Sequence, residues 1–492
     1  MNGSKVLDII EDKSLFKPYG YINGEWISSE KEKSFSIHNP SDGKIIATMP
    51  EMGIDDTKYA IESANQAFQT WSKKTPKERC IILRKWYDLV MKNIEDLSKI
   101  MTLENGKPIK ESRAEIVYAS TFIDWFSEEG KRVYGRSIPA TQNDKRIVTI
   151  KQPVGVCALI TPWNFPAAMI TRKVAPAIAA GCTVIIKPAE QTPLSASALV
   201  HLAELAGIPK GVINLLVANN PEKIGSELCT NKIIKKISFT GSTEVGKVLI
   251  KNSADTVKKV SMELGGNAPL IVFDDANVNV AVKETLASKY RNSGQTCVCA
   301  NRIFVQEGIF EEYANALAEK VASLKIGDGF EENNDIGPLI DSNGLKKVER
   351  HLQDAVSKGG KILTGGEKSK IGELYFQPTV LTNLSENMII FEEETFGPLA
   401  PLFKFKDENE VIRMANATNY GLAGYIFTKN LNRAWKIAEE LQFGMVGINS
   451  GILSTEVAPF GGVKESGIGR EGAIEGIDEY MEIKYLCFGN IE

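Results

Sequence analysis

Histidine and cysteine are scarce in this chain of 492 residues. The three histidines, His38, His201 and His351, have no partner at metal-ligand spacing, so we expect neither a metal site nor a catalytic histidine. The seven cysteines are odd in number and widely spread, which fits a reducing compartment better than a disulfide framework. Catalysis, if present, must therefore use other groups.

The sequence also lacks long apolar runs and a strong excess of one charge. No run approaches the roughly 18 apolar residues that a transmembrane helix needs, and the formal net charge is only −4. We therefore expect no membrane and no nucleic acid among its partners. Asp8, Glu11 and Asp12 argue against a transit or signal peptide, so we expect a cytoplasmic protein, or one already processed.

The length predicts two or more domains. Residues 54–128 show apolar positions every three to four residues, which is typical of helices. After Gly135, short apolar strands at 156–161, 183–188, 212–217 and 235–240 alternate with helical segments. This alternation predicts an α/β fold with a parallel sheet, and such sheets bind nucleotides at the carboxyl ends of their strands.

A second α/β region is expected after Glu263, with helices near 281–292 and 310–324 and a strand at 302–306. Residues 132–153 and 479–489 read instead as exposed β-ribbons. An apolar ribbon facing solvent invites aggregation unless it is paired, and pairing with another subunit is the simplest solution.

Three short segments carry candidate catalytic residues. Cys297 lies in GQTCVCANR, after a glycine-containing turn that would expose its thiol. Glu263 precedes the diglycine of MELGGNAP, and Asn164 lies in TPWNFP between a strand and a helix. Each alone also fits a structural role: a buried thiol, a surface acid or a helix cap.

Other strand-to-helix turns carry candidate ligand-binding residues. SFTGSTEVGK is neither the dinucleotide fingerprint nor a P-loop, so it is a weak phosphate motif by itself. Lys187 and Glu190 follow one strand, and Glu394 and Phe396 precede a Gly-Pro turn. Singly, these residues also fit solvated loops.

Together these segments resemble the aldehyde dehydrogenase superfamily over nearly the whole chain. The most specific feature is MELGG followed by GQTC, with Glu263 and Cys297 separated by 34 residues (297 minus 263). The resemblance implies an α/β fold with a Rossmann-like cofactor domain, an α/β catalytic domain and a small β-ribbon oligomerisation domain. Residues 1–133 and 152–263 would form the first, 264–471 the second, and 134–151 with 472–492 the third. A homodimer or homotetramer is implied.

The resemblance also implies a cofactor site. Ser242 would lie near the pyrophosphate, Lys187 and Glu190 at the adenosine ribose, Glu394 at the nicotinamide ribose and Phe396 near the nicotinamide. The full expected set is Thr161, Pro162, Trp163, Lys187, Glu190, Gly241, Ser242, Val245, Gly246, Leu264, Glu394 and Phe396. A carboxylate at Glu190 favours the ribose 2′-hydroxyl over a 2′-phosphate, so NAD is expected to be preferred, with NADP as the alternative.

Within the superfamily, ITRKV, GILS and PFGGVKESGIGREG are similar to the succinate-semialdehyde dehydrogenase branch. This implies that Arg172, Arg291 and Ser454 hold the substrate carboxylate. The implied reaction oxidises succinate semialdehyde to succinate with NAD(P)+ and water. The alternatives are a glutarate-semialdehyde or broad-specificity dehydrogenase, or a binding or structural relative that has lost catalysis.

The implied mechanism explains the residue types. Cys297 attacks the aldehyde to give a thiohemiacetal, whose oxyanion accepts hydrogen bonds from Asn164 and the Cys297 N–H. Loss of hydride leaves a thioester, which a water deprotonated by Glu263 hydrolyses. Acylating relatives lack this glutamate, so a non-acylating enzyme is expected. Cys299, two residues after the nucleophile, is a candidate redox partner for Cys297.

Overall fold

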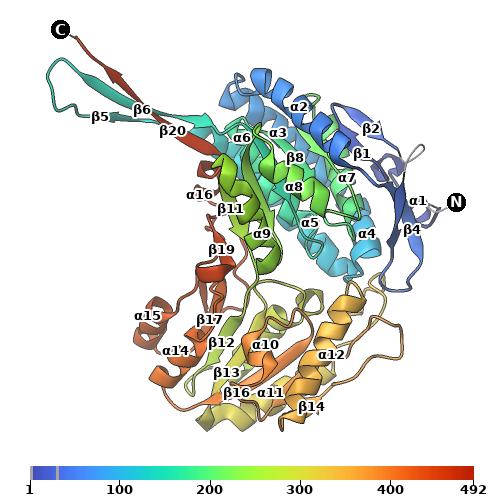
Figure 1. The fold of residues 1–492 in the computed structure, drawn as a ribbon. Coiled ribbons are helices and arrows are strands. Elements are labelled where there is room, and N and C mark those ends of the chain that lie inside the picture. Colours follow the sequence, from blue (N-terminus) through green and yellow to red (C-terminus); the bar gives the residue numbers. More distant parts are fainter. Residues whose placement is uncertain (1–3, 29–32, 492) are drawn as a thin grey trace.

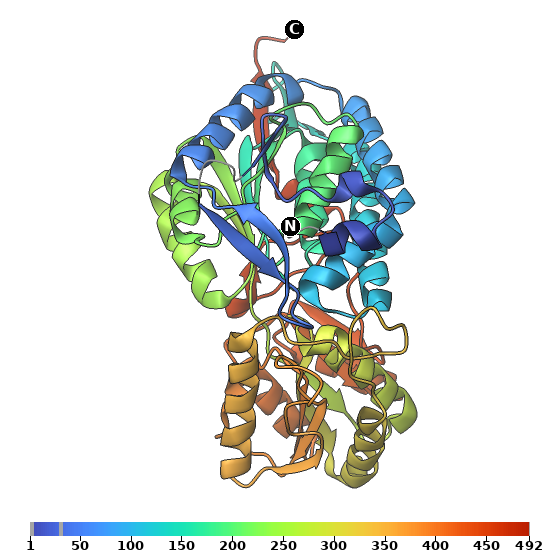
Figure 2. The ribbon, with the colours of Figure 1, turned by 90° about the vertical axis from the view of Figure 1, so that its right-hand side faces the viewer.

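The computed structural model describes residues 4–28 and 33–491. The predicted ranges that start at residue 1 and end at residue 492 therefore extend just outside the described part. Two lobes lie one above the other in Figures 1 and 2, each around its own sheet, and a β-ribbon projects from the upper lobe. Within the described part, no helix is both long and apolar enough to span a membrane.

The upper lobe contains an eight-stranded sheet. Its five central strands are parallel and almost wholly buried, as their apolar runs predict. In sheet order the strands are β19 (Gly467–Ile468), β11 (Lys259–Glu263), β10 (Ile234–Thr240), β7 (Val156–Ile160), β8 (Thr183–Lys187), β9 (Ile213–Leu215), β1 (Gly20–Ile22) and β2 (Glu25–Ile27).

Helices cover this sheet on both faces (Figure 1). The segment predicted to be helical holds four helices, α2 (Ile54–Trp71), α3 (Pro76–Lys92), α4 (Ile94–Asn105) and α5 (Ile109–Glu129). The crossovers add α6 (Ala168–Ala180), α7 (Pro193–Leu205), α8 (Glu222–Thr230) and α9 (Thr243–Ser253). Every residue of α6 is buried, including two cations, because α3 and α5 pack against it.

The lower lobe is built on a seven-stranded sheet, which is parallel except for β14 at one edge. The strand order is β14 (Lys361–Thr364), β15 (Thr379–Thr382), β16 (Leu399–Phe405), β13 (Ala300–Gln306), β12 (Ala268–Val272), β17 (Ala423–Phe427) and β18 (Met445–Ile448). Its helices are α10 (Val278–Lys289), α11 (Phe310–Ala322), α12 (Ser342–Ser357), α13 (Ile389–Glu392), α14 (Glu408–Asn416) and α15 (Leu431–Glu440).

The ribbon is a three-stranded antiparallel sheet of β5 (Arg136–Ile138), β6 (Arg146–Pro153) and β20 (Met481–Phe488). It combines the two segments that the sequence indicated as ribbons. The remaining elements are α1 (Ser4–Ile9), α16 (Glu475–Asp478) and a hairpin of β3 (Ser34–His38) and β4 (Ile45–Pro50). Short 3₁₀ turns are η1 (Lys13–Leu15), η2 (Gly130–Arg132), η3 (Ala254–Thr256), η4 (Arg291–Gly294), η5 (Glu307–Ile309) and η6 (Lys464–Ser466).

A buried carboxylate connects α5 to the start of α6. Glu115 Oε2 lies 2.6 Å from the Lys107 ammonium, and both side chains are about 1% exposed. Its other oxygen accepts hydrogen bonds from the backbone N–H groups of Ala167 and Ala168, at 3.0 and 3.3 Å. These are orphan donors of a helix N-terminus, so Glu115 caps α6 while neutralising a buried ammonium.

We expect Glu115→Ala to lower the free energy of unfolding by about 3–5 kcal/mol, because it leaves the buried Lys107 ammonium without a counter-charge, with only the Asn164 carbonyl as an acceptor. The matched control is Glu95→Ala, which breaks a solvent-exposed pair with Arg113 and is expected to cost about 0–1 kcal/mol. Urea denaturation of both variants measures the difference. Equal losses of unfolding free energy in the two variants would contradict the role of Glu115 as the buried partner of Lys107.

Candidate active site

The register of the upper sheet brings the predicted strand-end residues to one edge. Ile160 is paired with both Lys187 and Phe239, and Thr240 is paired with Glu263. All of these positions are the carboxyl ends of parallel strands. This is the edge where such sheets bind nucleotides.

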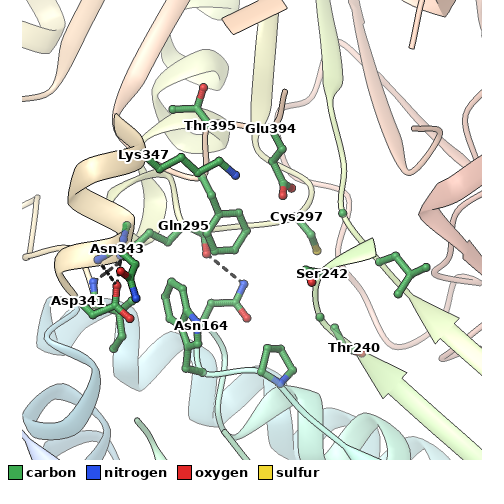
Figure 3. A pocket seen from close by; sticks show the side chains of 18 of the residues that line it. Asn164, Thr240, Ser242, Gln295, Cys297, Asp341, Asn343, Lys347, Glu394 and Thr395 are labelled. Atoms are coloured by element: carbon green, nitrogen blue, oxygen red, sulfur yellow. Dashed lines mark hydrogen bonds between the residues drawn. The ribbon is translucent and has the colours of Figure 1, made fainter. Parts of the chain in front are cut away.

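A cavity of about 440 Å³ opens at this edge, between the two lobes (Figure 3). Seven of the predicted cofactor residues line it: Pro162, Trp163, Gly241, Ser242, Leu264, Glu394 and Phe396. Ser242 is the N-cap of α9, and its hydroxyl accepts from the Val245 N–H at 3.4 Å. A helix N-terminus facing a cavity offers backbone donors to a phosphate.

The other five predicted cofactor residues do not line that cavity. Thr161 and Lys187 are buried at the ends of β7 and β8, and Val245 is 48% exposed on α9. Gly246 packs against Leu264, where a Cβ would lie 2.5 Å from a methyl group. The Lys187 ammonium lies 3.2 Å from a Glu190 oxygen, and burial lowers the pKa of Lys187 while Glu190 opposes this shift.

Two predicted cofactor residues from the lower lobe are held by contacts beside the cavity. The Phe396 ring meets the edge of Trp163 with centroids 5.5 Å apart. Glu394 accepts a hydrogen bond from the Gly266 N–H at 2.9 Å. Burial raises the pKa of Glu394 to about 7.

Cys297 follows a turn whose backbone is strained. Asn292 and Ser293 have φ of 50° and 57°, a left-handed conformation that non-glycine residues rarely adopt. Three hydrogen bonds hold this turn. The backbone N–H of Asn292 donates to the Glu111 carboxylate at 2.9 Å, and its side-chain amide donates to the Asn164 backbone carbonyl at 2.9 Å. The Ser293 hydroxyl donates to the Gly337 carbonyl at 2.8 Å.

The diglycine of MELGG lies directly against the Cys297 backbone. A Cβ on Gly266 would stand 2.2 Å from the Cys297 carbonyl oxygen, so only glycine permits this approach. The thiol is half-buried and lines the large cavity. Burial raises the pKa of Cys297 to about 12, the Arg172 charge opposes this shift, and Glu394 and Glu263 reinforce it. The free thiol is therefore protonated at neutral pH.

Asn164 lies beside Cys297 at the same cavity (Figure 3). Its amide nitrogen donates to the Gln295 carbonyl at 3.0 Å, and its side-chain oxygen accepts from the Phe165 N–H at 3.1 Å. A carboxamide nitrogen carries two donors. One proton thus orients the side chain, and the second is available to an oxyanion.

Glu263 is close enough to Cys297 to affect the pKa of its thiol, but it does not line the cavity. Both of its carboxyl oxygens are buried and lack a hydrogen-bond partner within the described part of the chain. The missing Cβ of Gly461 leaves room for one of them, since a Cβ there would be 3.0 Å away. Burial, reinforced by Glu471, raises the pKa of Glu263 well above 4.5, and Arg172 opposes the shift.

A second, smaller pocket lies on the other side of Cys297, and it contains all three predicted substrate residues. Arg172, Arg291 and Ser454 line it together with Cys297. The Arg291 guanidinium stacks 5.2 Å from the Phe165 ring centroid, and that of Arg172 lies 4.1 Å from the Phe460 ring. The pocket holds about 20 Å³ and adjoins a chamber of about 200 Å³.

Arg172 is already engaged in an ion pair. Its Nε lies 2.5 Å from Glu471 Oε2, and Lys173 binds the other oxygen of the same carboxylate. All three side chains are at most 6% exposed. The charge of Arg172 is therefore partly neutralised before any substrate arrives.

Cys299 is buried behind the nucleophile. Its sulfur lies 3.3 Å from the Lys289 ammonium, and burial raises the pKa of its thiol while Lys289 opposes that shift. Neither cysteine forms a disulfide bond within the described residues. A disulfide between Cys297 and Cys299 stays a prediction.

Sequence reasoning missed a group of residues at the start of α12 that line the large cavity. They are Asp341, Asn343, Gly344 and Lys347. Asp341 caps the helix by accepting from the N–H groups of Asn343 and Gly344, both at 2.9 Å. The cap could be read from DSNG, but nothing in the sequence places this helix opposite the first sheet. Glu471 and Tyr118 were also missed.

A cavity at the carboxyl edge of a parallel sheet, with a cysteine thiol between it and a second pocket, is the arrangement expected of a nucleotide-dependent enzyme that uses a cysteine. The sequence matches the aldehyde dehydrogenase family over residues 26–486. The chain belongs to this family and is an NAD(P)-dependent enzyme, as the motifs indicated.

Its relatives are similar over almost their whole length. The chain is 54% identical to the glutarate-semialdehyde dehydrogenase of Pseudomonas putida, covering 97% of this chain and 99% of that protein. It is 52% identical to the NADP(+) succinate-semialdehyde dehydrogenase of Escherichia coli, covering 98% and 99%. A crystal structure of succinate-semialdehyde dehydrogenase from Burkholderia pseudomallei is 53% identical, with a TM-score of 0.97 and coverage of 98% and 99%.

Proposed function

We propose that this enzyme oxidises succinate semialdehyde to succinate with NAD(P)+ and water, without acyl transfer to a thiol acceptor. The observation that carries the proposal is the position of Cys297, which lines both the large cavity and the arginine-containing pocket. The names of the relatives support the same class of substrate.

The large cavity fits a nicotinamide dinucleotide. The N-terminus of α9 at Ser242 supplies backbone donors for a pyrophosphate, and Glu394 supplies a buried carboxylate for a ribose. Lys187 and Glu190, at the end of β8, would hold the adenosine ribose. A nicotinamide bound there would supply the acceptor for the hydride whose loss converts the thiohemiacetal on Cys297 to a thioester. In this proposal residues 1–133 and 152–263 form the cofactor domain and 264–471 the catalytic domain, except that β19 (Gly467–Ile468) belongs to the sheet of the cofactor domain.

In the first half of the reaction Cys297 adds to the aldehyde carbon. Its proton must leave for the thiolate to form; it is lost to solvent through the large cavity that Cys297 lines, and the Arg172 charge favours the thiolate. The tetrahedral oxyanion accepts hydrogen bonds from the free Asn164 amide proton and from the Cys297 N–H. Removing one such donor typically costs about 10²–10³ in rate.

In the second half Glu263 takes a proton from water, which hydrolyses the thioester. From its position in this structure the side chain must rotate toward the cavity. Its raised pKa suits a general base, because a base works best when its pKa approaches the operating pH. The surroundings that raise it are burial and the negative charge of Glu471.

The distal carboxylate of the substrate would bind in the small pocket, at Arg291 and Ser454 and beside Arg172. A second substrate, glutarate semialdehyde, is favoured by the adjoining 200 Å³ chamber, which also contains Arg291 and Ser454. One further methylene changes binding by only about 1–3 kcal/mol.

The ribbon supports assembly into a homodimer or homotetramer. Ile483, Tyr485 and Phe488 of β20 are at least 50% exposed. An apolar strand at the edge of a three-stranded sheet is stabilised by pairing with a second copy. A reduced cytoplasmic setting fits the free thiols.

We expect Glu263→Gln to release a burst of NADH and then turn over about 10²–10⁴ times more slowly, because only deacylation needs the base. In the wild type, kcat should fall toward acid pH with an apparent pKa well above 4.5, since the raised pKa leaves less carboxylate at a given pH. Stopped-flow and pH profiles measure both effects, with Glu439→Gln as a surface control. If Glu263→Gln turned over at the wild-type rate, Glu263 would not be the general base for deacylation.

Succinate semialdehyde should exceed butanal, its uncharged analogue, by more than about tenfold in kcat/KM, because a hydrogen bond to a charged group contributes roughly 1.5–3 kcal/mol. Arg291→Gln should reduce this ratio, whereas Arg84→Gln, on the exposed face of α3, should not. A steady-state panel of C3 to C6 aldehydes, with and without a terminal carboxylate, provides the measurement. Equal values for the two C4 aldehydes would reject the distal anion site.

Glu190 should make the enzyme prefer NAD, because a carboxylate repels a 2′-phosphate and accepts hydrogen bonds from a 2′-hydroxyl. Lys187 weakens this preference, since its ammonium can turn from Glu190 to a phosphate. Glu190→Ser should shift the kcat/KM ratio toward NADP, and Lys187→Met should shift it toward NAD. A wild-type enzyme that already prefers NADP, as the name of the E. coli relative states for that protein, would refute the prediction.

A further inference from the structure

Tyr118 stands at the neck between the small pocket beside Cys297 and the outer chamber. It lies on α5 and lines both spaces, as do Phe165, Arg291 and Ser454. Its ring is fixed by an edge contact with Phe122 at a centroid distance of 5.0 Å. The hydroxyl is therefore carried on a rigid support at the place where Arg291 and Ser454 meet.

Two buried polar atoms at this neck lack well-formed hydrogen bonds. The Tyr118 hydroxyl and the Arg291 Nε are both buried, and neither makes a hydrogen bond of normal geometry in the described part of the chain, although the side chains of Arg172 and Ser454 lie near enough to the hydroxyl to affect its pKa. A buried donor without a partner costs about 1–3 kcal/mol. Two such donors at one constriction indicate that a ligand with acceptor oxygens completes them.

The hydroxyl is a donor at neutral pH. Burial raises the pKa of Tyr118, and this shift is only partly opposed by the charge and hydrogen-bonding side chain of Arg172, the charge of Arg291 and the side chain of Ser454. The phenol therefore keeps its proton and can donate it to an anion. A phenolate here would instead compete with the substrate for the arginines.

The charges on either side confine an anion to the neck. On the inner side, Glu471 already pairs with Arg172. On the outer side, the Lys107 ammonium is paired with Glu115, and the Glu111 carboxyl also lines the chamber. Within the described residues, Arg291 is the cation of these two spaces that has no ion pair.

We propose that the Tyr118 hydroxyl is a specificity-determining donor to the distal anion of the substrate, acting at the neck together with Arg291 and Ser454. This inference rests on the proposed function, because it assigns the group that recognises the charged end of the semialdehyde. It adds a neutral donor on α5 to the two arginines and the serine.

The test compares Tyr118→Phe with wild type on succinate semialdehyde and butanal. The ratio of kcat/KM for the two substrates should fall about tenfold, mainly through KM for the charged substrate, and the Ki of the product succinate should rise about tenfold. Tyr134→Phe, which removes a hydroxyl from a residue 71% exposed to solvent, is the matched control. Thermal melting verifies folding, and Tyr118→Met removes the same hydroxyl should Tyr118→Phe fail to fold.

Different results would overturn the proposed function and the role of Tyr118. A wild-type enzyme without preference for succinate semialdehyde over butanal would overturn the proposed function. A wild type that shows the preference, with a Tyr118→Phe ratio and succinate Ki equal to its own, would overturn the role of Tyr118 alone. Equal losses on both substrates would also overturn it, since they would assign Tyr118 to packing.

Discussion

The ion triad of Glu471 with Arg172 and Lys173 is the interaction on which the arrangement of the active site depends. Both cations belong to α6, whose residues are all buried, and each would be costly there without a partner. The one carboxylate that pairs with them lies 298 residues further along the chain than Lys173. Pairing therefore fixes the C-terminal segment against α6. That segment continues from β19, which pairs with β11 and places Gly467 opposite Glu263.

The same triad determines the charge state around Cys297. Glu471 is the carboxylate kept ionised, because Lys173 and Arg172 lower its pKa despite complete burial. Glu263 is then the second carboxylate beside the same cations, and its pKa is raised by burial and by Glu471. Two like charges near one another titrate at separated values. The triad thus keeps one carboxylate ionised and leaves the second with a raised pKa, as the proposed general base requires.

Features of the site that depend on local sequence patterns could be predicted, whereas those that depend on contacts between distant segments could not. Lys187 could be placed at the cofactor edge because it ends a predicted strand, and strand ends in a parallel sheet converge. Glu263 was instead assigned from the MELGG motif, since the strand that carries it, β11, was not among the predicted strands. The burial of Arg172 and Lys173 could not be read from α6, since it depends on α3, α5 and the distant Glu471. The same holds for Tyr118: the helical pattern places it on α5, but only tertiary packing shows that it borders the small pocket beside Cys297.

The position of Cys297 results from the meeting of the two lobes. The left-handed turn at Asn292 and Ser293 belongs to the lower lobe, but Glu111 and Asn164 of the upper lobe supply two of the contacts that hold it. From the other direction, Gly266 approaches so closely that the Cys297 carbonyl fills the space of a side chain. Neither lobe could fix the thiol alone, because each supplies only part of these contacts. A reaction that needs a cofactor on one side of the sulfur and an aldehyde on the other requires this arrangement, since the thiol must face both cavities without moving.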